Sequence, residues 1–143
     1  MVQLARDLFS LQNEARIDPS GFVSRLRDEA LFDAADALEN ASPRACSAFT
    51  RSNGLDQAAL EHSDVLAQTG AQSHTVGTST FFGRIEKYGS WSTTIGENIA
   101  FGRDTAFTVL GGLINSPGHR ENIYNCDFTL VGIACQDGHP RFR

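Results

Sequence analysis

The chain has 143 residues, of which 41% are hydrophobic and 20% are charged, values typical of a single globular domain. Its net charge of −5 argues against nucleic acid as a partner, because a phosphate backbone selects a dense basic patch. No apolar run reaches the ~18 residues that predict a membrane-spanning helix. The first residues also lack the basic and apolar regions of a signal peptide.

The first third of the chain predicts helices. Apolar residues recur at helical spacing over 4–15. Asp18 followed by Pro19 then offers an N-cap with proline at the first helical position. The apolar stripe of this second helix covers 22–30, and a helical stretch over 34–38 can continue it. Residues 40–54 have the composition of a loop.

The clearest helix is expected over 55–69, where Gly70 is placed to end it in a left-handed conformation. His62 lies on the apolar side of this helix, which predicts a packed core histidine and not a ligand. Residues 81–89 indicate a short helical turn with a glycine stop.

The second half predicts a buried helix between two strands. Residues 95–101 suggest a short strand, and Asp104 can cap a helix over 105–115 that is apolar nearly all round. The Gly111-Gly112 pair in that helix predicts close approach of a neighbouring backbone. Residues 129–135 form the second expected strand.

Asp137-Gly138 after this strand is a hairpin signal, so a further strand is expected to follow it. The chain ends at Arg143 instead. We therefore expect the natural protein to be longer at its C-terminus, with the edge of the 129–135 strand left open here.

Cys46, Cys126 and Cys135 make an odd number of cysteines. Three buried free thiols are one interpretation, and a disulfide between two of them is the other; the sequence does not choose the pair. Zinc ligation by cysteine is not expected, because no Cys-x-x-Cys pair is present.

Three short motifs carry the residues that could perform chemistry: Gln-Ser-His over 72–74, Gly-Glu-Asn-Ile-Ala over 96–100, and Ser-Pro-Gly-His-Arg-Glu-Asn-Ile over 116–123. Each motif alone is weak, since a lone histidine is more often a hydrogen-bonded structural group and Gly-Glu-Asn is more often a turn. Their order along the chain is far more specific.

This order, together with Asn13 and Arg16 in the first helix, resembles the CAP superfamily of cysteine-rich secretory proteins, antigen 5 and pathogenesis-related proteins. The resemblance covers nearly the whole chain and is strongest to the bacterial and protist type. It implies an α+β fold, an α-β-α sandwich with helices on both faces of a small antiparallel sheet. It implies that 1–143 is a single domain that lacks its last strand. An extracellular or cell-surface monomer is also expected.

The resemblance further implies a cleft in which His74, Glu97 and His119 converge, with His74 and His119 as the metal ligands. The family's second acid is expected in the helix before the last histidine, where residues 105–120 contain no Asp or Glu and Ser116 takes its place. Weak Zn²⁺ binding follows, because the site loses negative charge and support for its ligands.

Three polar residues beside these motifs, Asn98, Arg120 and Asn122, are expected to support the turns structurally, because their side chains can satisfy backbone carbonyls. The function implied is a ligand-binding or interaction module for a small molecule, a lipid or a protein. One alternative is a protease-like hydrolase with Glu97 as base, although no nucleophile is evident. The other is a lipid or sterol carrier, which requires a wide apolar groove.

Overall fold

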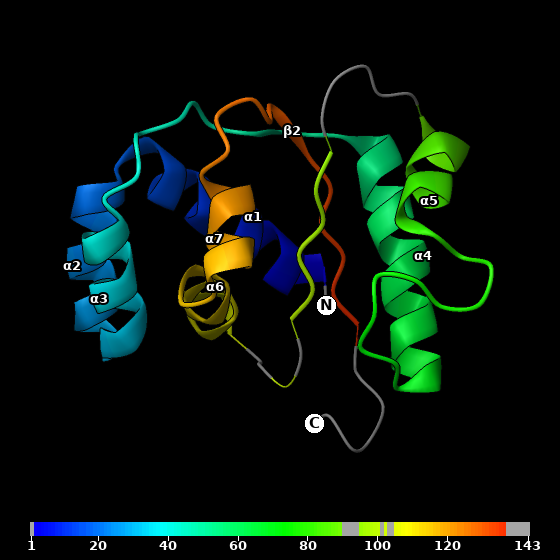
Figure 1. The fold of residues 1–143 in the computed structure, drawn as a ribbon, viewed down its shortest axis with the longest axis horizontal. Helices are drawn as coiled ribbons and strands as arrows, with labels where there is room; N and C mark the ends of the chain where they lie inside the picture. The colour runs from blue at the N-terminus through cyan, green and yellow to red at the C-terminus, as the bar shows by residue number, and fades with distance from the viewer. Residues whose placement is uncertain (1, 90–94, 101, 103–104, 137–143) are drawn as a thin grey trace.

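A computed structural model of the chain, drawn in Figure 1, describes residues 2–89, 95–100, 102 and 105–136. The predicted cap Asp104 and the predicted turn at Asp137-Gly138 lie outside the described residues. None of the described helices combines the length and the apolar character needed to cross a membrane.

The described part of the chain contains seven helices and two very short strands, which confirms the α+β class. In chain order they are α1 (Val2–Ile17), α2 (Pro19–Asp28), α3 (Phe32–Ala41), β1 (Thr50–Arg51), α4 (Asn53–Thr69), α5 (Phe81–Tyr88), α6 (Ala106–Ile114), α7 (Pro117–Ile123) and β2 (Leu130–Val131).

The start of α2 follows the sequence prediction, because the Asp18 carboxylate accepts a hydrogen bond from the Gly21 amide with Pro19 in the first turn. The predicted end of that helix is wrong. Ala30 has a φ of 57°, a left-handed conformation that breaks the helix. Residues 34–38 therefore belong to a separate helix, α3, which packs back against α2.

One hydrophobic core holds α1, α2, α3, α6 and α7 together on one side of the molecule (Figure 1). Leu110 and Ile114 of α6 are fully buried in it. The close approach predicted at the glycine pair is found at Gly111, where a Cβ would meet a Leu31 side-chain carbon at 3.0 Å. The neighbour is thus a side chain and not the predicted backbone. The cap of α6 is Thr105, whose hydroxyl accepts from Thr108.

The helices α4 and α5 pack against each other on the opposite side (Figure 1). Ser52 caps the start of α4, and Gly70 ends it with a φ of 72°, as predicted. Gly89 follows the last residue of α5, as expected for its glycine stop.

The sheet differs from the expectation, since β1 and β2 pair in parallel, Thr50 opposite Leu130 and Arg51 opposite Val131. A disulfide between Cys46 and Cys126 explains the direction. The two cysteines are 80 residues apart, the same separation as the paired strand residues, so both segments leave the disulfide side by side in one register. The strand predicted from residue 95 is not formed over 95–100, and only Leu130–Val131 of the 129–135 strand is regular.

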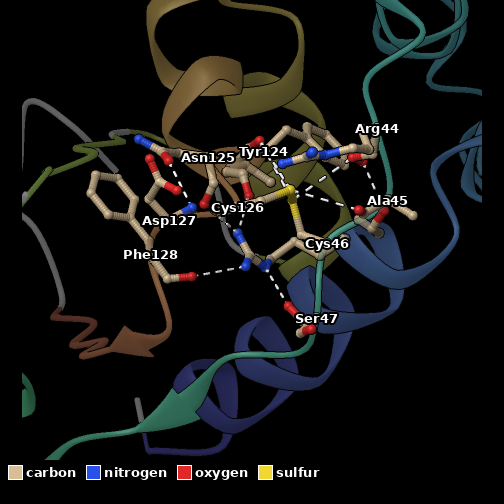
Figure 2. The surroundings of a disulfide bond; sticks show 12 residues. Arg44, Ala45, Cys46, Ser47, Tyr124, Asn125, Cys126, Asp127 and Phe128 are labelled. Atoms are coloured by element: carbon tan, nitrogen blue, oxygen red, sulfur yellow. Dashed lines mark hydrogen bonds between the residues drawn. A yellow bond between two sulfur atoms is a disulfide. The ribbon is translucent and has the colours of Figure 1, made fainter.

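Ser47, Asn125 and Phe128 lie around this disulfide (Figure 2). Their carbonyls accept hydrogen bonds from Arg16, which is 1% exposed. Its guanidinium lies 3.7 Å from the centroid of the Phe49 ring. It donates hydrogen bonds to four carbonyls, those of Ser47, Ile123, Asn125 and Phe128. These bonds connect α1 to the chain around Cys46 and to the chain around Cys126. The second of these stretches leads into β2.

Candidate functional site

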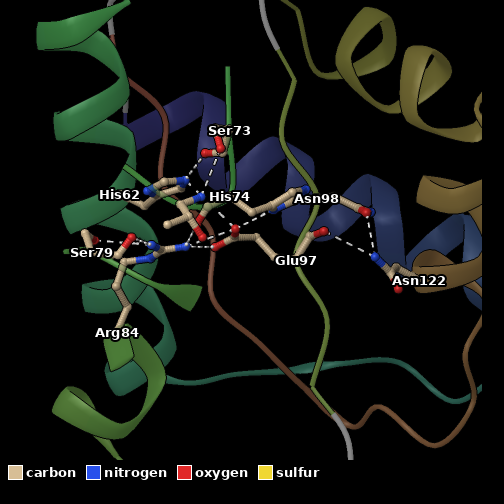
Figure 3. A network of polar contacts seen from close by, with 9 residues as sticks. His62, Ser73, His74, Ser79, Arg84, Glu97, Asn98 and Asn122 are labelled. Carbon is tan, nitrogen blue, oxygen red and sulfur yellow. Dashed lines mark hydrogen bonds and ion pairs between the residues drawn. The ribbon is translucent and has the colours of Figure 1, made fainter. Parts of the chain in front are cut away.

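The carboxylate of Glu97 is the centre of a polar cluster between α4, α5 and the segment 95–100 (Figure 3). Its Oε1 atom lies 2.6 Å from Nδ1 of His74 and 3.9 Å from Nε2 of His62. Nη2 of Arg84 donates to both oxygens, at 3.0 Å and 2.8 Å. Two of the three predicted cleft residues, His74 and Glu97, are therefore in direct contact.

Arg84 is 2% exposed, and its helix α5 positions it for this role. Phe81, Arg84, Ile85 and Tyr88 share the inward face of α5 by helical spacing, so the arginine lies within an apolar stripe. Besides binding Glu97, it donates to the carbonyls of Ser79 and His74. Its Nε–H has no hydrogen-bond partner among the described residues.

His62 is buried on α4, as predicted, but it belongs to this cluster and not to the apolar core. Its Nε2 atom lies 2.7 Å from the Ser73 carbonyl, which can only accept, so Nε2 carries the proton. Nδ1 is then the acceptor of a neutral ring, and no described residue donates to it. Burial lowers the pKa of His62, and the neighbouring Arg84 charge lowers it further, whereas the Glu97 charge opposes the shift.

His119, the third predicted cleft residue, is linked to the cluster through its backbone. Asn98 donates to the His119 carbonyl at 3.2 Å, and Asn122 donates to the Glu97 carbonyl and to the Asn98 side chain. Arg120 donates instead to the Ile114 carbonyl at the end of α6. The His119 imidazole takes part in none of the hydrogen bonds and ion pairs of the described residues, so its approach to His74 stays a prediction.

A cavity of about 810 Å³ opens next to the cluster. His62, Arg84 and Glu97 line one part of it. The remaining wall exposes polar and apolar groups to a similar extent and comes from α1, α4, α5 and α6 and from residues 95–100 and 128–136; its apolar residues include Leu8, Leu66, Ile85, Val109 and Leu113. Ligand sites of proteins typically have volumes of roughly 300–1,000 Å³.

The geometry around His74 can be compared with what a metal requires. A histidine that binds a metal usually donates the N–H of one ring nitrogen to a carboxylate. This hydrogen bond orients the other ring nitrogen toward the metal. His74 fits this pattern, since Nδ1 faces Glu97 and its side chain is 53% exposed, leaving Nε2 accessible. Across the described residues no group of three or more His, Cys, Asp or Glu side chains is placed to hold one ion. The orientation of His74 fits that of a metal ligand, and its pairing with a second histidine stays a prediction.

The predicted base and the serine next to the first motif have other partners in this arrangement. Arg84 donates a hydrogen bond to each oxygen of the Glu97 carboxylate. The Ser73 hydroxyl accepts from the Thr75 amide, and His62 approaches the Ser73 carbonyl and not the hydroxyl. No contact between a nucleophile and its base is formed at this serine.

Arg84 is not among the residues predicted for the site, and His62 was predicted to be a core histidine. A signal for Arg84 was present, since an arginine inside an apolar helical stripe must be buried and must find an acceptor. For His62 the spacing gave the correct side of the helix. The contact with residue 73, however, depends on how the chain turns back after Gly70.

Comparison with known proteins supports the resemblance found in the motifs. The model of the CAP family, the cysteine-rich secretory protein family, matches residues 9–142, so the chain belongs to this family. It is 42% identical over 63 residues to the uncharacterized protein YkwD of Bacillus subtilis (strain 168). The match covers 44% of this chain but only 24% of that protein. No solved structure gives a significant match. Membership supports a general role as a ligand-binding or interaction module.

Proposed function

We propose that this CAP domain binds an elongated, largely apolar ligand in the cavity beside Glu97, with the ligand's polar end at the Glu97 cluster. The cavity itself carries the proposal, because about 810 Å³ of space with apolar residues from four helices in its wall adjoins the buried pair formed by Arg84 and Glu97. Apolar area supplies affinity in such sites, and a few fixed polar groups supply orientation. Binding takes place outside the cell or at its surface, as the secretory family suggests.

The ion pair at the polar end of the cavity carries no net charge. Arg84 and Glu97 neutralise each other, and burial favours the neutral form of His62. A strongly charged ligand would leave its charge unpaired in the cavity, which costs several kcal/mol. A neutral ligand with hydrogen-bonding groups suits this end better.

The neutral dye Nile red tests whether the cavity takes up an apolar molecule. Ala59 of α4 lines the cavity, whereas Leu60, the next residue, is 44% exposed and lies outside the lining. We expect Ala59→Trp to weaken dye binding at least about fivefold by filling the cavity, and Leu60→Trp, the matched control, to leave it unchanged. Equal binding by the wild type and Ala59→Trp would contradict the proposal.

We also propose weak Zn²⁺ binding through His74 and His119, supported by the carboxylate behind His74. When bound, the ion would supply a Lewis acid with open positions for water or ligand. Calorimetric titration should show affinity that falls as the pH drops below about 6.5, where free imidazole becomes protonated. His74→Ala and His119→Ala should each abolish the signal. The same affinity for wild type and His119→Ala would remove this histidine from the site.

The lipid carrier remains a candidate because the apolar wall favours it. Nile red displacement by lipid ligands distinguishes a carrier from a site of another ligand class. For the hydrolase alternative, the candidate base Glu97 already accepts hydrogen bonds from Arg84 at both of its oxygens.

A further inference from the structure

The segment 71–80, which joins α4 to α5 and carries His74, has little regular structure of its own. All of its residues are described, and they form no helix or strand but only an isolated bridge between Val76 and Ser79. Backbone pairing within the segment therefore does not determine where His74 lies relative to Glu97. Side chains of other elements must do so.

Arg84 supplies most of these contacts (Figure 3). Its Nη1 group donates to the carbonyl and the hydroxyl of Ser79. Its Nη2 group donates to the carbonyl of His74 and to both carboxylate oxygens of Glu97. A guanidinium presents its donors in a rigid planar fork, so the backbone of His74 and the carboxylate of Glu97 are held together by one group.

The partners of Arg84 are not those of a residue that only attaches α5 to α4. All five of its hydrogen bonds go to the segment 71–80 or to Glu97, and among the described residues none goes to α4. Lys87, on the same helix, does make that attachment, because it forms an ion pair with Glu61 of α4. The two cations of α5 thus serve different places.

Glu97 is held at its backbone and at its side chain. Asn122 donates to its carbonyl, and Arg84 donates to its carboxylate. The Oε1 atom also lies 2.6 Å from Nδ1 of His74. An ionised carboxylate can only accept, so Nδ1 carries the ring proton. In a neutral imidazole the lone pair is then on Nε2.

We propose that Arg84 is the positioning residue of this site. By holding the Glu97 carboxylate against the backbone of His74, it fixes His74 as the Nδ1–H tautomer with Nε2 as the nitrogen that binds. The inference rests on the proposed function in one respect, since Zn²⁺ is the ion that would use this nitrogen.

The first test reads the tautomer of His74 in the metal-free full chain, from two-bond ¹H–¹⁵N NMR correlations of the imidazole ring. The measurement is made at about pH 8, above the roughly 6.5 at which a free imidazole titrates. We expect Nδ1–H in the wild type, whereas a solvent-exposed histidine without such a partner favours Nε2–H. A wild-type His74 that is mainly Nε2–H would overturn the proposal.

Substitutions then test whether Arg84 sets this tautomer. Arg84→Met removes the fork and should shift His74 to Nε2–H. Arg84→Lys keeps the charge without the fork and should give a mixture of the two tautomers; it also serves if Arg84→Met does not fold. Lys87→Met, the matched control, removes the other α5 cation and should retain Nδ1–H. An unchanged tautomer in the folded Arg84 variant, or the same shift in Lys87→Met, would overturn the positioning role.

Calorimetric titration with Zn²⁺ separates this inference from the proposed metal site. We expect Arg84→Lys to weaken Zn²⁺ binding roughly tenfold, as is typical when a partner behind a ligand is changed, and Lys87→Met to leave it unchanged. A tautomer shift without Zn²⁺ binding by the wild type overturns the metal proposal and leaves the positioning role intact. Zn²⁺ binding by the wild type, with the tautomer unchanged in the Arg84 variants, overturns the positioning role alone.

Discussion

Each half of the molecule is organised around a buried arginine, and the two arginines have different partners. Arg16 is surrounded by backbone carbonyls next to the disulfide, whereas Arg84 holds the carboxylate of Glu97 between two histidines. The first set of partners cannot change its charge. The second contains groups that titrate, and it borders a cavity.

We call Arg16 with its four carbonyl partners the structural centre, and Arg84 with Glu97, His62 and His74 the chemical centre. Carbonyl oxygens accept four hydrogen bonds from the Arg16 guanidinium but leave its charge without a counterion. Burial accordingly lowers the pKa of Arg16. Such a residue fixes loops in place. Arg84, by contrast, is paired with a carboxylate beside the cavity, so its counterion can be removed by a single substitution.

The largest effect is expected at the structural centre. Arg16→Met leaves four carbonyls without their donor, and each unpaired buried group costs roughly 1–3 kcal/mol. We expect the free energy of unfolding to fall by more than about 4 kcal/mol, a large part of the roughly 5–15 kcal/mol by which a typical domain is stable. Arg6→Met, on the exposed face of the same helix, is the control and should change little. Urea unfolding measures both. Similar stabilities of the two variants would show that Arg16 is dispensable.

At the chemical centre a second substitution should restore part of the unfolding free energy that the first one removes. Arg84→Met leaves the Glu97 carboxylate, whose side chain is 17% exposed, without its counterion. Breaking a buried pair in this way costs about 3 kcal/mol. Arg84→Met combined with Glu97→Gln should therefore be less destabilised than the sum of the two single variants. Strict additivity would mean that the pair is not coupled. No such repair is available for Arg16, which has no carboxylate partner among its hydrogen bonds.

The sequence predicted those features of the fold that arise within short segments. The Asp18 cap, the left-handed end of α4 at Gly70 and the inward face of α4 all follow from local spacing and from glycine's freedom at positive φ. The break at Ala30 was missed because alanine strongly favours helices, and tertiary packing of α2 on α3 overrides that preference.

Features that join distant segments could not be predicted in the same way. The parallel pairing of β1 and β2 depends on the choice of Cys46 and Cys126 as the disulfide pair, which the count of three cysteines left open. The contact of His74 with Glu97 followed from the family motif. The contribution of Arg84 did not, because it arises when α5 packs against α4.

The smallest predicted effect concerns the protonation of His62. Burial and Arg84 lower its pKa in the folded chain, so the folded state binds fewer protons than the unfolded state as the pH falls below about 6.5. Glu97 and His74 also face this ring, and of these only Glu97 favours the protonated form. The stability that His62 contributes is therefore fully present above the unfolded pKa and declines on acidification, with a slope of at most about 1.4 kcal/mol per pH unit.

His62→Gln provides the test, since the amide of glutamine can still donate to the Ser73 carbonyl but does not titrate. Other groups contribute to acid unfolding in both proteins, so the difference between them isolates His62. We expect the variant to lose less stability than the wild type between pH 6.5 and the lower folded pKa, measured by urea unfolding at a series of pH values. Parallel stability curves would show that His62 takes up no proton on unfolding, and the chemical centre would then respond to pH only through its other groups.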